Sequence, residues 1–207
     1  MLTKKYKDIY DASCKIATKI SCNQLNVIVD LGARHGEGYD RLGKYFKNAK
    51  YIFVEPSPRC IPIIIEKMKH IEGDVELIQG VLGNTNRVTN FHLLENDNDQ
   101  SGNMYTDRNG IYGQSSIIEI DVYDYKNFIS NLGHIDFLKC NIEGGEYELI
   151  ETSFFDHVTS FVIEAHNRLV GNKTYIDIVN ALQDKFDMEI WGDTSYKYCF
   201  INGIRKA

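Results

Sequence analysis

The feature that most constrains this fold is the stretch 26–38, which reads NVIVDLGARHGEG. It begins with a short apolar run, typical of a strand buried on both faces, that ends at Asp30. Gly32 and Gly36 can adopt positive φ or let a ligand approach the backbone. The segment 37–48 then has helical periodicity. Strand, glycine turn and helix predict a nucleotide site, although an ordinary tight turn of an α/β protein has the same pattern.

A second apolar stretch, 51–54, also ends on an acid, Glu55, which Pro56 follows. Ligands of doubly wound sheets bind beyond the carboxyl ends of the strands, and an acid about 20 residues after the glycines is suited to ribose hydroxyls. We therefore expect Glu55 to bind the ribose of a nucleotide cofactor, with Pro56 beside it. Val81 follows a third predicted strand, 75–78, and is expected near the base of the cofactor.

The glycine spacing and Asp30 bear on which nucleotide is bound. The dinucleotide fingerprint is GxGxxG, whereas this chain has glycines at 32, 36 and 38. A carboxylate at the mouth of the turn would repel a pyrophosphate but would attract a cationic amino group such as that of S-adenosylmethionine. The residues favour S-adenosylmethionine over NAD, and an NAD-linked oxidoreductase of Rossmann type is the alternative.

Length and composition limit the class of protein. A chain of 207 residues that is 43% hydrophobic predicts a single domain over 1–207 with a full core. The formal net charge of -6 argues against a nucleic-acid partner, which needs a basic face. The five cysteines form no CxxC pair, and no metal site is predicted. Without a signal peptide or a long apolar run, we expect a cytoplasmic protein with no membrane partner.

Four further segments carry expectations about architecture. Residues 1–24 are expected to be a helical segment that either covers the edge of the sheet or shields the cofactor pocket. Stretches 87–94 and 116–122 read as strands added to the main sheet, paired with each other. The polar loop 95–115 between them carries Met104, Tyr105 and Tyr112, and is expected to be a lid over the acceptor.

Four blocks of the chain resemble the FkbM family of S-adenosylmethionine-dependent methyltransferases, over Val27 to His166. They are DLGAxxG at 30–36, FVEPSP at 53–58, LKxxIEGxE at 138–146 and IExH at 163–166. The resemblance implies an α/β class I methyltransferase fold, Rossmann-like and doubly wound. Its seven-stranded sheet would be mostly parallel, and the segments 188–191 and 198–201 predict an antiparallel hairpin at one edge.

The resemblance also implies an activity, namely O-methylation of a hydroxyl on a sugar or another small biosynthetic intermediate. By matching position, the cofactor loop would contain Asp30, Gly32, Ala33 and Gly36, and Glu55 would hold the ribose. The family pattern has Asp where this chain has Asn141, so a non-catalytic cofactor-binding protein is a further alternative. The sequence indicates neither the acceptor nor the oligomeric state.

Methyl transfer to a hydroxyl requires alignment of the reactants and removal of a proton, and a positioned base contributes about 10²–10⁴-fold. The candidate catalytic residues follow two buried strands, and they are Lys139, Asn141, Glu143, Glu164 and His166. Some of these residues could instead have a purely structural role. The histidine could cap a loop, Glu143 could favour a helix start, and Lys139 could pair with Glu143 or Glu164.

Overall fold

The computed structural model describes residues 7–20, 26–46, 48–94, 102–104, 115–167, 169–192 and 197–207. Its helices are α1 (Ile9–Lys19), α2 (Glu37–Leu42), α3 (Ile61–Met68), α4 (Tyr125–Leu132), α5 (Glu146–Ile150) and α6 (Tyr175–Leu182), with 3₁₀ turns η2 (Gly43–Tyr45) and η3 (Phe154–His157). Its strands are β1 (Val27–Leu31), β2 (Lys50–Glu55), β3 (Val75–Gln79), β4 (Val81–Gly83), β5 (Arg87–Leu94), β6 (Gly102–Asn103), β7 (Ser115–Asp124), β8 (Ile135–Cys140), β9 (Val158–His166), β10 (Phe186–Trp191) and β11 (Tyr198–Arg205).

The main sheet has seven strands in the order β10-β11-β9-β8-β1-β2-β3. The pairs from β9 to β3 are all parallel, and the order reverses direction around β1, as in doubly wound sheets. Strand β11 lies between β9 and β10 and is antiparallel to both. The predicted fold class and the closing hairpin are therefore confirmed.

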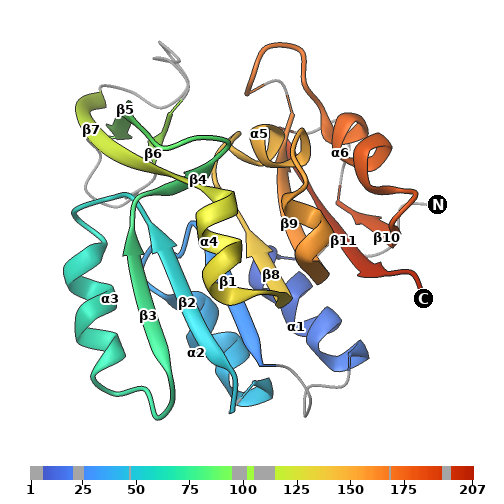
Figure 1. Cartoon of the computed structure of the whole chain (residues 1–207), viewed down its shortest axis with the longest axis horizontal. Helices are drawn as coiled ribbons and strands as arrows, with labels where there is room; N and C mark the ends of the chain where they lie inside the picture. The colour runs from blue at the N-terminus through green and yellow to red at the C-terminus, as the bar shows by residue number, and fades with distance from the viewer. Residues whose placement is uncertain are drawn as a thin grey trace.

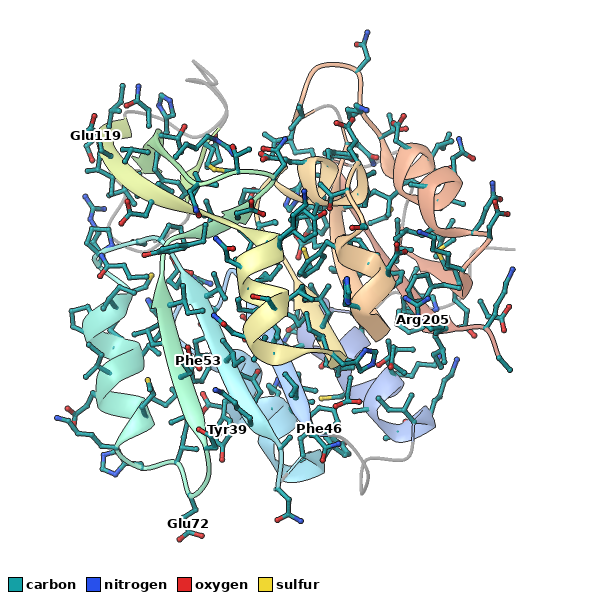
Figure 2. The ribbon with its side chains drawn as sticks, viewed as in Figure 1. Tyr39, Phe46, Phe53, Glu72, Glu119 and Arg205 are labelled. Atoms are coloured by element: carbon teal, nitrogen blue, oxygen red, sulfur yellow. The ribbon has the colours of Figure 1, made fainter. Side chains whose placement is uncertain are left out.

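Helices cover both faces of this sheet (Figure 1). On one face, strand residues pack against α4, α5 and α6. On the other face they pack against α1, α2 and α3, and this cluster includes Phe46 and Phe53, with the partly buried Tyr39 against it (Figure 2). Because side chains alternate along a strand, Ile28 of β1 belongs to the second cluster and Val29 to the first. This double burial explains the uninterrupted apolar runs of the parallel strands.

The strands at 87–94 and 116–122 pair with each other but do not join the main sheet, so that part of the prediction is wrong. They form a separate sheet in the order β4-β7-β5-β6, above the carboxyl ends of β1, β2 and β3 (Figure 1). The alternation of buried and exposed side chains along these strands explains why they form a separate sheet. Phe91 and Ile120 face a small core, whereas Val88 and Ile117 are each 59% exposed, which suits a half-covered antiparallel layer.

One predicted helix boundary also needs correction. Helix α2 ends at Leu42 and continues only as the η2 turn, so the helix does not reach residue 48. Helix α3 begins after Cys60, which places Pro62 in its first turn, where a missing N–H costs nothing. Of the predicted lid, Tyr105 and Tyr112 lie outside the described residues. No helix in the described ranges is long and apolar enough to cross a bilayer.

Candidate functional site

The turn after β1 is held against two neighbouring strands. The N–H groups of Gly32 and Ala33 donate to the carbonyl of Val54 at 2.9 and 3.2 Å. Gly32 has φ of 73°, and a Cβ at this position would lie 1.8 Å from the carbonyl oxygen of Asn141, just after β8. The position needs glycine because it combines a left-handed backbone with this close approach. The turn therefore lies at the carboxyl ends of β1, β2 and β8.

Asp30 does not lie at the mouth of this turn, which corrects the expected position of its carboxylate. The side chain is fully buried, and its Oδ1 lies 3.0 Å from Nζ of Lys139, its register partner on β8. The Tyr51 hydroxyl donates to Oδ2 at 3.3 Å. A Cβ on Gly38 would lie 2.1 Å from the same oxygen, so the first turn of α2 closes over Asp30.

Lys139 was expected to pair with Glu143 or Glu164, and its observed partner is Asp30 instead. The lysine is 1% exposed, and its Nζ donates to the carbonyl of Gly32 at 2.6 Å. A cation in this position satisfies both the buried carboxylate and the carbonyl of the turn. The two residues thus support the glycine turn from below and do not line the cavity described next.

Glu55 occupies a different environment at the end of β2. Its Oε2 accepts a hydrogen bond from the N–H of Arg34 at 2.7 Å, and its Oε1 accepts one from the N–H of Ser57 at 2.8 Å. Burial raises the pKa of Glu55 to about 7, and these two hydrogen bonds oppose the increase. Arg34 has φ of 52°, so a strained residue holds the glutamate. Each oxygen keeps a lone pair for a further donor.

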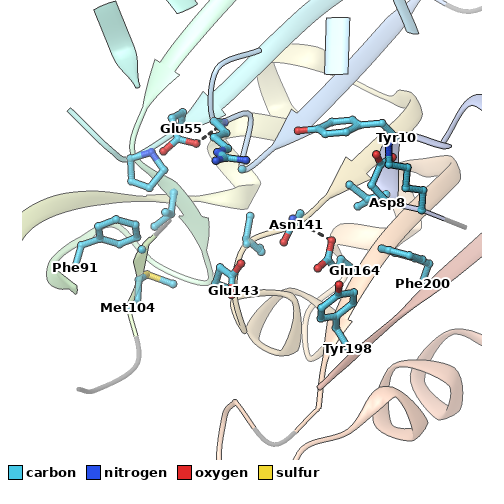
Figure 3. Close-up of a pocket in the computed structure, with 18 residues that line it drawn as sticks. Asp8, Tyr10, Glu55, Phe91, Met104, Asn141, Glu143, Glu164, Tyr198 and Phe200 are labelled. Carbon is cyan, nitrogen blue, oxygen red and sulfur yellow. Dashed lines mark hydrogen bonds between the residues drawn. The ribbon is translucent and has the colours of Figure 1, made fainter. Parts of the chain in front are cut away.

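A cavity of about 280 Å³ lies beside the turn. In Figure 3, Glu55 lies toward one end of it, Tyr198 and Phe200 lie toward the other, and Asn141 lies between them. The predicted site residues that line it are Gly32, Glu55, Pro56, Val81, Asn141, Glu143 and Glu164. The cavity therefore unites the predicted cofactor side with most of the candidate catalytic residues.

Two residues of the predicted cofactor loop do not reach this cavity. Ala33 is fully buried in the core beside α1 and α2. Gly36 has φ of 72° at the start of α2, and its Cα faces the side chains of Phe53 and Lys67. Both residues shape the turn rather than line the cavity.

His166 is buried among carboxylates. Its Nδ1 lies 3.1 Å from Glu146, and its Nε2 lies 3.3 Å from Glu143 and 3.7 Å from Glu164. Burial would lower the pKa of His166, but the charges of Glu143 and Glu146 outweigh burial and raise it well above the ordinary value. These carboxylates therefore favour the protonated imidazole, and in that form it cannot accept a proton.

Glu164 lies on the boundary between the cavity and a smaller recess of about 90 Å³ that His166 also lines. Nδ2 of Asn141 donates to Glu164 Oε2 at 3.1 Å. Burial raises the pKa of Glu164 to about 7, although the charge of His166 opposes the increase. Oδ1 of Asn141 is buried and has no hydrogen-bond partner among the described residues. Within those residues, no group of three or more His, Cys, Asp or Glu side chains could hold a metal ion.

Several aromatic lining residues were not predicted from the sequence, and they are Tyr10, Phe91, Tyr198 and Phe200. Tyr198 and Phe200 are the register partners of His166 and Glu164 across the β9–β11 pair. This register depends on how the closing hairpin packs, and it has no local sequence signal. Residues 7–10 line the cavity, so the N-terminal helix does contact the pocket. Met104 of the predicted lid lines it as well.

Comparison of solved structures supports the fold. An rRNA methylase from Streptococcus thermophilus superposes with a TM-score of 0.55 at 12% identity, covering 98% of this chain and 99% of that one. Precorrin-6y C5,15-methyltransferase from Geobacter metallireducens gives 0.52 at 14% identity, with 100% and 93% covered. At such identities the likeness shows the class I methyltransferase fold alone.

Sequence comparison gives the family. No curated protein matches the chain closely. Residues 30–187, however, match the methyltransferase FkbM domain, and this range contains both the glycine turn and the carboxylate cluster. The match makes S-adenosylmethionine the cofactor and removes the NAD-linked alternative. The chain therefore belongs to the FkbM family of methyltransferases, which use S-adenosylmethionine as the methyl donor.

Proposed function

We propose that this methyltransferase acts on a hydroxyl of a small acceptor, a sugar or another biosynthetic intermediate, with Glu164 as the general base. The observation that carries the proposal is a carboxylate only 13% exposed at the junction of the cavity and the recess, with its pKa raised to about 7. A base whose pKa lies near the working pH is suited to take the proton of an alcohol during methyl transfer.

The other candidate catalytic residues then take different roles. Protonated His166, held by Glu143 and Glu146, offsets the negative charge of Glu164. Glu143 has φ of 49° and lines both the cavity and the recess, so it is placed to contact the acceptor. Lys139 acts indirectly, because it supports the backbone of the glycine turn.

The donor end fits S-adenosylmethionine, which supplies a methyl group on a sulfonium. Glu55 offers free lone pairs to ribose hydroxyls, since its two backbone hydrogen bonds leave capacity on both oxygens. Pro56 and Val81 supply apolar surface for the base. Asp30 contributes through Lys139 rather than by direct contact.

The acceptor atom is tested by product analysis. The protein is incubated with S-adenosylmethionine carrying a ¹³C-methyl group and with fractions of small metabolites, and the labelled product is examined by NMR. We expect the carbon shift of a methyl ether. A methyl on nitrogen, carbon or sulfur would overturn the proposal.

The base is tested with the acceptor found in this way. Glu164→Gln keeps the shape of the side chain but cannot take the proton, so kcat should fall by about 10²–10⁴-fold. Affinity for S-adenosylmethionine, measured by calorimetry, should stay unchanged. His166→Ala should likewise lower turnover far more than cofactor affinity. An unchanged kcat for Glu164→Gln would remove the glutamate from the mechanism.

A further inference from the structure

The amide of Asn141 is an uncharged hydrogen-bond partner of the proposed base. Asn141 directly follows β8 and Glu164 lies near the end of β9, and these strands are parallel neighbours with Cys140 opposite Ile163. Adjacent strand ends therefore bring the two side chains together, and Nδ2 donates to Oε2 at 3.1 Å (Figure 3). An ionised carboxylate only accepts hydrogen bonds, so the amide must present its nitrogen to it.

We propose that Asn141 is a positioning residue that fixes the Glu164 carboxylate through Oε2, so that Oε1, which lies 3.7 Å from Nε2 of His166, receives the proton of the acceptor hydroxyl. This inference rests on the proposed role of Glu164. An amide holds the neighbouring carboxylate in its ionised form, whereas a second carboxylate would oppose ionisation.

Charged groups surround Glu164, so the charge of the side chain at position 141 affects the pKa of Glu164. His166 from the same strand and Lys139 from β8 favour the ionised form of Glu164, and Glu143 and Glu146 oppose it. Tyr198 of β11 lines the same cavity, and burial raises the pKa of the neighbouring Cys199 thiol to about 12. A further carboxylate about 3 Å away could donate only when protonated, so the two groups would titrate as a coupled pair.

The inference is tested by titration of Glu164 in the whole protein without any acceptor. The ¹³C shift of the Glu164 carboxyl is followed from pH 4 to pH 9 and is assigned by its loss in Glu164→Gln. We expect the titration midpoint to rise in Asn141→Ala, because the carboxylate loses a donor. In Asn141→Asp it should rise by about one pH unit or more.

A matched control is Asn167→Ala. Asn167 lines the same recess, and its Oδ1 accepts a hydrogen bond from the N–H of Tyr175 at 2.9 Å. The midpoint of Glu164 should not move in this variant. Affinity for S-adenosylhomocysteine should stay within about threefold of wild type in both Asn141 variants, because the amide acts on the base.

Two results would overturn the inference. One is an equal Glu164 midpoint in wild type and Asn141→Ala, a variant that adds no charge and therefore does not depend on whether Asn141→Asp folds. The other is a loss of S-adenosylhomocysteine affinity with an unchanged midpoint, which would make Asn141 a cofactor ligand. Failure of O-methylation itself is distinguishable, because the titration uses no acceptor and the product analysis does not involve Asn141.

Discussion

At the scale of single residues, Asp30 and Glu55 have the same charge and end neighbouring strands, yet they meet different surroundings. Asp30 is covered by the first turn of α2 and is neutralised by Lys139. Glu55 lines the cavity and is held by two backbone N–H groups. The structure thus separates a carboxylate that supports the turn from one that is available to a ligand.

We therefore expect Glu55→Ala to weaken binding of S-adenosylmethionine by about 10–100-fold, since hydrogen bonds to a charged group contribute about 1.5–3 kcal/mol. Calorimetry on the protein without acceptor measures the effect. Glu76→Ala is the control, because Glu76 is exposed on β3, where it pairs with the half-buried Lys50. Equal affinity of wild type and Glu55→Ala would reject the ribose assignment.

Gly32 and Gly171 allow a second test at this scale, because both have left-handed φ, 73° and 57°. A Cβ on Gly171 meets nothing within 4 Å, whereas one on Gly32 would meet the Asn141 carbonyl. Gly171→Ala should cost about 1 kcal/mol of unfolding free energy from backbone strain alone. Gly32→Ala should cost about 2–4 kcal/mol, because the opposing atom is backbone. Urea unfolding measures both, and similar losses would contradict the close approach.

The surroundings of the site residues show which of their positions could be predicted from the sequence. Glu55 was identifiable because an acid at the end of a buried strand beside a glycine turn reaches the ligand crevice in any doubly wound sheet. The burial of Asp30 was not, because it depends on the packing of Gly38 against it. Asn141, Glu143 and Glu164 follow strand ends in sequence, but their grouping around His166 depends on the order of β8 and β9 in the sheet.

At the scale of elements, the ion pair between Asp30 and Lys139 joins β1 to β8 in direct register. Lys139→Met would leave a buried carboxylate unpaired, which costs about 3–5 kcal/mol. The double variant Asp30→Asn with Lys139→Met should lose less than the sum of the single variants, because no buried charge remains. Thermal and urea unfolding of the wild type, the two single variants and the double variant measure these losses as a double-mutant cycle.

The control for this cycle is the pair between Lys50 and Glu76, whose side chains are 31% and 46% exposed. Lys50→Met should cost less than about 1 kcal/mol, as is usual for surface pairs. Strictly additive losses at Asp30 and Lys139 would show that the pair does not couple β1 to β8.

The periodic patterns located the strands of both sheets but not their partners. Strand β7 alternates between exposed Ile117 and buried Ile120, so its sequence identified a half-covered strand. This alternation does not indicate whether the strand lies at the edge of the main sheet or belongs to a second sheet. Long-range pairing is decided by which apolar faces remain uncovered after the parallel core forms, and single-strand patterns do not carry this information.

For the molecule as a whole, three buried groups at the site have raised pKa values. Those of Glu55 and Glu164 rise from 4.5 to about 7 because of burial, and that of His166 rises because neighbouring carboxylates outweigh burial. A group with a raised folded pKa stabilises the fold below its unfolded pKa and loses that contribution as pH rises through the folded value. The two glutamates thus contribute fully to the stability of the fold below about pH 4.5, and this contribution is lost as pH rises through about 7. His166 contributes below about pH 6.5 and loses it at higher pH. All three contributions to stability therefore decrease as pH rises.

The protein without cofactor should therefore become less stable as pH rises from 5 to 8, with each glutamate contributing on the order of 3 kcal/mol to the decrease. Urea unfolding at pH 5, 6, 7 and 8 measures the slope. Glu164→Gln should flatten it, because the amide does not titrate, whereas Glu119→Gln, on the exposed outer face of the small sheet (Figure 2), should leave it unchanged. A stability that rises over this interval would mean that these carboxylates are not held in a desolvated site. It would also remove the physical basis for a base that works near neutral pH.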